Sequence, residues 1–127
     1  MLRYFAYGAN IDHERMSSRV PEAVVVGPGY VDRFGVEFTI RDREWGGGVL
    51  NAREVPEGRL WGVVYEGPVE AITYRVIPIA NYVRPSDRYL THISRAMKAQ
   101  GLPPEAIEAV LAADRDAGES AGPSIVS

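Results

Sequence analysis

Residues 4–10, which read Tyr-Phe-Ala-Tyr-Gly-Ala-Asn, constrain the fold of this chain more than any other stretch. An aromatic, β-prone run ends abruptly at Gly8, and residues 11–19 that follow are polar with helical character. This order predicts a buried strand, a tight glycine turn and the start of a helix. Backbone N–H groups at such a junction lack partners and favour anions, because they and the helix dipole point the same way. The turn therefore predicts a pocket for a carboxylate or a phosphate. The alternative is a plain turn, in which Gly8 serves only its own backbone dihedrals.

The composition indicates one domain with one hydrophobic core. The chain has 127 residues, of which 46% are hydrophobic. Its net charge is −3 and its basic residues are interspersed with acidic ones, so we expect no nucleic-acid partner. No apolar run approaches the ~20 residues of a membrane-spanning helix, and the first residues do not resemble a signal peptide. We therefore expect no membrane partner and a cytoplasmic location.

Residues suited to metals or to redox chemistry are scarce in this sequence. The absence of cysteine excludes disulfides, thiolate nucleophiles and cysteine-based metal sites. The two histidines, His13 and His92, are far apart in the sequence and have no neighbouring ligand at helical spacing. We therefore expect no metal site.

The spacing of apolar residues and of turn formers predicts an α+β fold. Alternating runs bounded by glycine and proline predict strands, and apolar residues three or four apart predict helices. The expected strands are 2–7, 23–26, 30–40, 49–53, 59–65 and 70–77, with a hairpin turn at 56–58. The expected helices are 11–19, 88–100 and 104–112. This order predicts a small curved mixed sheet, or a partly open β-barrel, flanked by short helices.

Capping residues and composition set the predicted boundaries. The candidate N-caps are Asn10 or Asp12 for the first helix and Ser86 or Asp87 for the second. From residue 114 onward the chain is charged and rich in glycine and serine, which predicts a loosely ordered tail. We therefore predict a single domain over residues 1–113 and a tail over residues 114–127.

Four segments, taken in order, resemble the γ-glutamylcyclotransferase-like family. The first is residues 4–10, where the family usually has Ser in place of Ala9. The second is the glycine-led strand Gly-Gly-Val-Leu-Asn at 47–51, and the third is Arg-Leu-Trp-Gly-Val-Val-Tyr at 59–65. The fourth lies in the C-terminal third and comprises Ala71 to Tyr74, Asn81-Tyr82, Pro85-Ser86, Tyr89 and Gly101-Leu102-Pro103. Each segment alone is a weak signal, but four in the correct order make the resemblance specific.

The resemblance implies a small γ-glutamyl or amino-acid-like ligand and a reaction that needs no cofactor. Family members split a γ-glutamyl amide when the substrate's own α-amine attacks its γ-carbonyl, which gives 5-oxoproline and a free amine or amino acid. Such chemistry needs a grip on the α-carboxylate, donors for the developing oxyanion and a carboxylate base. The residues that the resemblance implies for ligand binding are Tyr7, Gly8, Ala9, Asn10 and Ile11 of the turn, with Tyr74 and Tyr82 lining the pocket.

The catalytic glutamate of the family has no counterpart in this sequence. In the family it lies on a helix after the central strand, but here Gly67-Pro68 leads directly toward the next strand. Two explanations stay open: either the protein lacks this segment, or the printed sequence omits it. If the segment is lacking, Glu66 and Glu70 are the nearest acids and become the fallback candidates for the catalytic base. The alternative is that both are solvated carboxylates at the end of a strand.

Two other functions remain open at this point. The first is a non-catalytic ligand-binding or protein-interaction module on the same fold. The second is a homodimer formed through an exposed strand edge, because the loss of a strand leaves unpaired backbone N–H and C=O groups. The sequence alone does not identify the leaving group of the substrate, the oligomeric state or the pathway.

Overall fold

The computed structural model describes residues 2–68 and 82–121, with side chains through residue 115. Its elements in chain order are β1 (Leu2–Ala6), the 3₁₀ helix η1 (Ala9–Ile11), α1 (His13–Arg19), β2 (Val24–Asp42), β3 (Gly47–Gly67), α2 (Asp87–Ala99) and α3 (Pro104–Ala121). The strand expected at 70–77 lies outside the described residues. The α+β class is confirmed.

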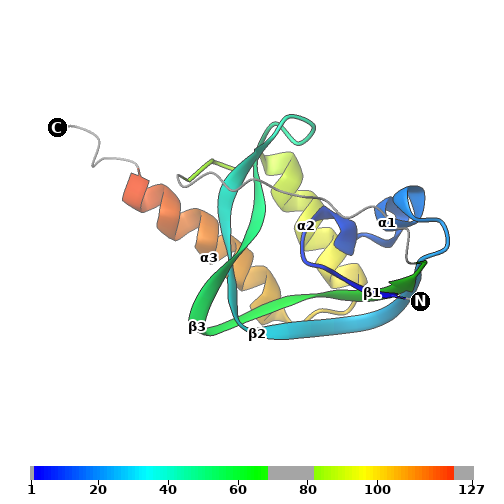
Figure 1. Ribbon diagram of the computed structural model, residues 1–127. Helices are drawn as coiled ribbons and strands as arrows, with labels where there is room; N and C mark the ends of the chain where they lie inside the picture. Colours follow the sequence, from blue (N-terminus) through cyan, green and yellow to red (C-terminus); the bar gives the residue numbers. More distant parts are fainter. Residues whose placement is uncertain (1, 69–81, 122–127) are drawn as a thin grey trace.

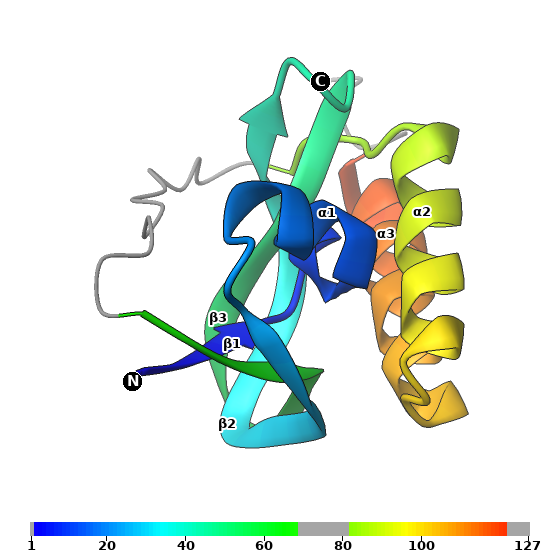
Figure 2. The ribbon, with the colours of Figure 1, turned by 90° about the vertical axis from the view of Figure 1, so that its right-hand side faces the viewer.

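The described strands form one open, curved sheet in the order β1-β3-β2. Both strand pairs are antiparallel, and β2 and β3 make a long, strongly bent hairpin. Helices α2 and α3 lie side by side along one side of this hairpin, and η1 and α1 lie between β1 and α2 (Figure 1; Figure 2). This arrangement places the glycine turn between the sheet and α2.

The two long strands correct the sequence prediction. The strands expected at 23–26 and 30–40 are one strand, and so are those expected at 49–53 and 59–65. The predicted hairpin turn at 56–58 is wrong, because these residues fall in a register shift of β3 opposite Arg33, where the strand bends without reversing. Arg33 has a φ of 70°, which fits such an irregularity. The chain reverses instead at residues 43–46, where Gly46 has a φ of 75°.

The helix caps follow the predicted side chains. The Asp12 carboxylate accepts a hydrogen bond from the Arg15 N–H at 3.0 Å, and the Ser86 hydroxyl accepts one from the Tyr89 N–H at 3.1 Å. Helix α3 continues to Ala121, so residues 114–121, which were expected in the loose tail, are helical. Residues 122–127 lie outside the described part of the chain.

The core joins the sheet to both long helices. Its members come from the turn, from β2 and β3 and from the inner faces of α2 and α3, and they include Ile11, Phe38, Trp45, Val63, Tyr65, Tyr89, Ile93, Met97 and Val110. Ile11 and Tyr65 are completely buried. The end of η1 is therefore fixed by packing as well as by hydrogen bonds. Within the described residues, no helix is long and apolar enough to cross a membrane.

Candidate functional site

The four carbonyl groups of residues 8–11 in the glycine turn are all hydrogen-bonded within the protein. The Gly8 oxygen accepts from the Ile11 N–H at 3.0 Å. The Ala9 oxygen accepts from the Asp12 N–H at 3.2 Å, and the Nε2 atom of His92 lies 3.1 Å from the same oxygen. These bonds fix the two peptide planes that contain the Gly8 and Ala9 carbonyls.

Two further carbonyls are held by Tyr65 of β3 and Gln100, which follows α2. The Tyr65 hydroxyl lies 3.0 Å from the Asn10 oxygen and 3.1 Å from the Ile11 oxygen, and these two acceptors share its single hydrogen. The Gln100 amide donates to the Ile11 oxygen at 3.0 Å. Burial and then the nearby charge of Asp12 raise the pKa of Tyr65 to about 12, so the hydroxyl stays protonated.

This bonding directs two amides of the turn away from the groups that hold its carbonyls. In a trans peptide the N–H points opposite to the C=O of the preceding residue, and the described residues contain no cis peptide. Since the Gly8 and Ala9 oxygens are held by the protein, the N–H groups of Ala9 and Asn10 point to the other side. Neither N–H has a hydrogen-bond partner among the described residues. The Ile11 N–H is excluded from the predicted backbone cradle, because it is already bonded and the Ile11 side chain is fully buried.

The side-chain oxygen of Asn10 is a second unsatisfied group at the turn. Its Oδ1 atom is buried and has no hydrogen-bond partner within the described part of the chain. A buried acceptor without a partner costs about 1–3 kcal/mol, so it indicates a site for a donor such as a water or a ligand N–H.

Two tyrosine hydroxyls lie on the sheet side of the turn. The Tyr89 hydroxyl accepts a hydrogen bond from the Leu50 N–H at 3.1 Å, and a Cβ atom placed on Gly8 would lie 3.5 Å from that hydroxyl. The backbone of Ala52 lies near the Tyr7 hydroxyl and partly offsets the effect of burial on its pKa. Burial raises the pKa of both hydroxyls above the usual tyrosine value, so both remain neutral.

Sequence reasoning named Tyr89 in the C-terminal segment that resembles the family, but it missed the position of this residue beside the turn. The signal was available, because a buried tyrosine needs a partner for its hydroxyl. Tyr89 lies in the first turn of α2, just after the Ser86 cap, so its hydroxyl can reach across to Leu50 and Gly8.

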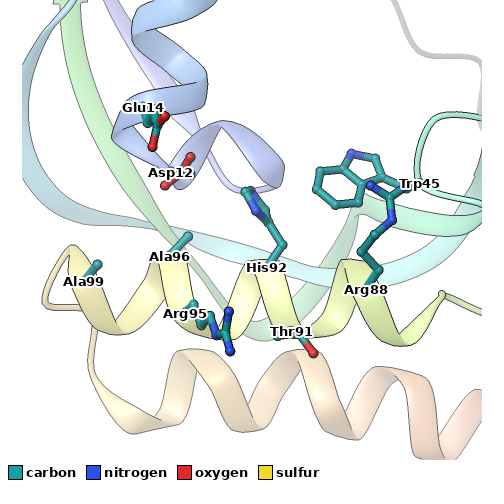
Figure 3. A pocket seen from close by; sticks show the side chains of 9 residues that line it. All are labelled: Asp12, Glu14, Trp45, Arg88, Thr91, His92, Arg95, Ala96 and Ala99. Atoms are coloured by element: carbon teal, nitrogen blue, oxygen red, sulfur yellow. The ribbon is translucent and has the colours of Figure 1, made fainter.

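A groove of about 630 Å³ lies on the other side of η1, between α1 and α2. Figure 3 shows Asp12 and Glu14 on its upper wall, with His92 reaching from α2 toward η1 and Trp45 at one end. The remaining lining residues all come from α2: Arg88, Thr91, Arg95, Ala96 and Ala99. The groove therefore combines acidic groups of the first helix with basic groups of α2.

Comparisons with known proteins agree with this architecture. No family model matches the chain. A γ-glutamylcyclotransferase of Bos taurus is 34% identical over 67 residues, which cover 50% of this chain and 36% of the bovine protein. A solved structure described as a γ-glutamyl cyclotransferase superposes with a TM-score of 0.74 at 25% identity and covers 87% of this chain and 86% of its own. The chain is similar to γ-glutamylcyclotransferases in fold and in part of its sequence.

Two further solved structures share the fold. An uncharacterized Homo sapiens protein superposes with a TM-score of 0.70 at 24% identity, over 87% of this chain and 86% of its own. YkqA from Bacillus subtilis superposes with a TM-score of 0.61 at 22% identity, over 87% of this chain and 52% of its own. The bovine match spans little more than a third of that protein's length, so the family resemblance by itself leaves the activity of this chain to be proposed.

Glu66, the fallback acid inside the described residues, is not brought to the turn. Glu66 pairs with Arg3 across β1 and β3, with a distance of 3.1 Å between Oε1 and Nε. Its neighbour Tyr65 points to the turn, and successive side chains of a strand point to opposite faces, so Glu66 points away. Glu70 lies outside the described residues.

Of the two tyrosines predicted to line the pocket, Tyr82 and Tyr74, the structure describes only Tyr82. The Tyr82 hydroxyl donates to the Asp114 carboxylate of α3 at 2.6 Å, so it faces α3 instead of serving the turn. Tyr74 lies outside the described part of the chain. The described residues contain no cluster of three or more His, Asp or Glu side chains that could hold a metal ion.

Proposed function

We propose that this chain binds a γ-glutamyl or similar amino-acid-type ligand at the glycine turn. The observation that carries the proposal is the bonding of the turn: its carbonyls are held by the protein, and the N–H groups of Ala9 and Asn10 are left to face outward. Two adjacent backbone donors at the start of a helical segment suit a carboxylate. The α-carboxylate of the ligand is the group that they receive.

Two other groups at the turn that are not fully hydrogen-bonded suit the rest of such a ligand. The Asn10 Oδ1 atom accepts a hydrogen bond, and the α-amine of the ligand supplies the donor. The Tyr89 hydroxyl accepts from Leu50, which leaves its own hydrogen for the γ-carbonyl oxygen of the ligand. A neutral donor in this place stabilises negative charge that develops on that oxygen.

We further propose that the bound ligand cyclises. The nitrogen of its α-amine attacks the γ-carbonyl carbon, which forms a new C–N bond. The bond from this carbon to the leaving nitrogen breaks, and the proton lost by the attacking amine is delivered to the leaving amine. The products are 5-oxoproline and a free amine or amino acid. The turn contributes orientation, because it holds the carboxylate while the amine faces the γ-carbon.

A non-catalytic ligand-binding or protein-interaction module is the second candidate function. One observation favours it: Glu66, the fallback base inside the described residues, is paired with Arg3 on the face away from the turn. A base is needed to remove a proton from the α-ammonium group before it attacks. A chain without one would bind the ligand at the same amides without splitting it.

Release of 5-oxoproline separates the two functions. The protein is incubated with γ-glutamylalanine and, separately, with a γ-glutamyl alkylamine, and 5-oxoproline is quantified by mass spectrometry against a reaction without protein. Tyr89→Phe is the test variant and Tyr82→Phe the control, because each removes one hydrogen-bonded hydroxyl and only Tyr89 lies beside Gly8. Release that falls in Tyr89→Phe alone supports the enzyme; binding without release identifies the module.

A homodimer and a cytoplasmic location also stay proposals. The exposed apolar side chains of β2 give the dimer a candidate surface, comprising Val24, Val26, Tyr30 and Val31. Gel filtration at several protein concentrations tests the dimer, and a monomeric profile at every concentration counts against it.

A further inference from the structure

His92 of α2 holds the turn from the side opposite to its free amides. Its Nε2 atom lies 3.1 Å from the Ala9 carbonyl oxygen. A carbonyl oxygen only accepts hydrogen bonds, so Nε2 must carry the hydrogen in this contact. The bond joins two segments that are 83 residues apart in the sequence, α2 and the turn.

The His92 ring is itself held in place by Trp45. The two ring centroids are 4.7 Å apart, with the planes inclined at 44°. Trp45 is anchored at both backbone ends: its N–H donates to Asp42 at 3.1 Å, and its carbonyl accepts from Ser86 at 2.6 Å. Figure 3 shows His92 reaching from α2 toward η1, with Trp45 beside it. The hairpin loop thus fixes the imidazole that grips the turn.

The Ala9 carbonyl and the Asn10 N–H belong to the same peptide plane, and the groups of one trans plane point in opposite directions. Whatever fixes the carbonyl therefore also aims the amide. The backbone bond from the Asp12 N–H to this carbonyl is long, at 3.2 Å, so the His92 contact is a second constraint on the same plane.

We propose that His92 is a positioning residue, which aims the Asn10 N–H at the carboxylate of the ligand by holding the Ala9 carbonyl. This inference rests on the proposed function for its ligand. It assigns His92 no contact with the ligand and no part in proton transfer.

Three substitutions of His92 test the inference. His92→Gln keeps an N–H donor near the position of Nε2, His92→Asn places its donor near the position of Nδ1, and His92→Leu has no donor. Two quantities are measured for each: the ¹⁵N chemical shift of the Asn10 amide in the free protein, and the Kd for γ-glutamylalanine by calorimetry. The thermal midpoint of unfolding is recorded to detect a general loss of structure.

We expect the Leu and Asn variants to shift the Asn10 ¹⁵N signal and to raise the Kd by about fivefold, as the loss of one hydrogen bond predicts. The Gln variant should keep the wild-type shift and a Kd within about twofold. An unchanged Asn10 signal in His92→Leu overturns the inference. So does a lower thermal midpoint with an unchanged Kd, because that pattern indicates a merely structural role.

The failure of the inference is distinguishable from the failure of the proposed function. If the wild-type protein does not bind γ-glutamylalanine, the proposed function fails. The Asn10 signal of the free His92 variants then still decides whether His92 orients this peptide plane.

Discussion

The hydroxyl of Tyr65 lies 3.0 Å from the carbonyl oxygen of Asn10 and 3.1 Å from that of Ile11. Through this side chain, the middle strand β3 is hydrogen-bonded to the end of the turn that carries the proposed ligand site. A strand residue therefore holds the carbonyl side of η1, while the amides of Ala9 and Asn10 stay outward.

Tyr65→Phe should lower the free energy of unfolding by about 1–3 kcal/mol. The substitution leaves the Asn10 oxygen without its described donor, and burying an unpaired polar group carries a cost of this size. Urea denaturation followed by circular dichroism measures the change. A stability equal to the wild type would show that water replaces the hydroxyl at no cost.

Alkaline pH should destabilise the protein partly through Tyr65. Its pKa is raised to about 12 in the folded state, against about 10 for an ordinary tyrosine. The unfolded chain therefore loses this proton first. The stabilising contribution is fully present below pH ~10 and is lost as the pH rises toward ~12. Urea denaturation at pH 8, about 10 and about 11 should show a shallower decline in Tyr65→Phe than in the wild type. Equal slopes would contradict the assigned shift.

Much of this fold follows from local sequence signals, whereas the assembly of the site does not. The Ser86 and Asp12 caps and the apolar face of α2 are predictable because capping and helical spacing act within a few residues. The sequence did not predict that the expected strands merge into β2 and β3, because glycine and proline usually indicate turns. In the long hairpin these residues lie within continuous strands whose pairing contains register shifts.

The sequence predicted that the turn has unpaired backbone N–H groups, but not which residues they belong to. The strand–glycine–helix order of residues 4–19 indicated unpaired backbone donors. The Asn10 amide is aimed in part by the contact from His92, and Tyr65 and Gln100 hold the next two carbonyls; all three residues come from distant segments. The periodicity and spacing of residues in a single sequence do not predict such long-range hydrogen bonds.

Gly48→Ala should be much more destabilising than Gly8→Ala. A Cβ on Gly48 would overlap the carbonyl oxygen of Val83, which belongs to the segment that leads into α2. We expect a loss of about 1–3 kcal/mol from this overpacking. A Cβ on Gly8 has its nearest contact at 3.5 Å and a φ of −118° that any residue adopts, so its effect should stay below about 1 kcal/mol. Thermal unfolding of the two variants compares them directly, and equal midpoints would refute the close approach at Gly48.

Glu66→Gln should leave 5-oxoproline release within about twofold of the wild type and stability within about 0.5 kcal/mol, because a partly exposed ion pair contributes little. The carboxylate pairs with Arg3 on the face away from Tyr65. The assay and the denaturation series above measure both quantities, with Glu22→Gln as an exposed control. A selective loss of release in Glu66→Gln would identify Glu66 as the base and contradict this placement.

The central claim is that the outward amides of the turn receive a carboxylate. The most direct measurement is a titration of ¹⁵N-labelled protein with γ-glutamylalanine, followed by the backbone amide signals. We predict that the Ala9 and Asn10 amides move most, with saturation, and that the same ligand converted to its α-carboxamide moves them far less. If γ-glutamylalanine leaves both signals unmoved at concentrations that saturate other sites, or if the α-carboxamide moves them equally, the turn is not a carboxylate cradle.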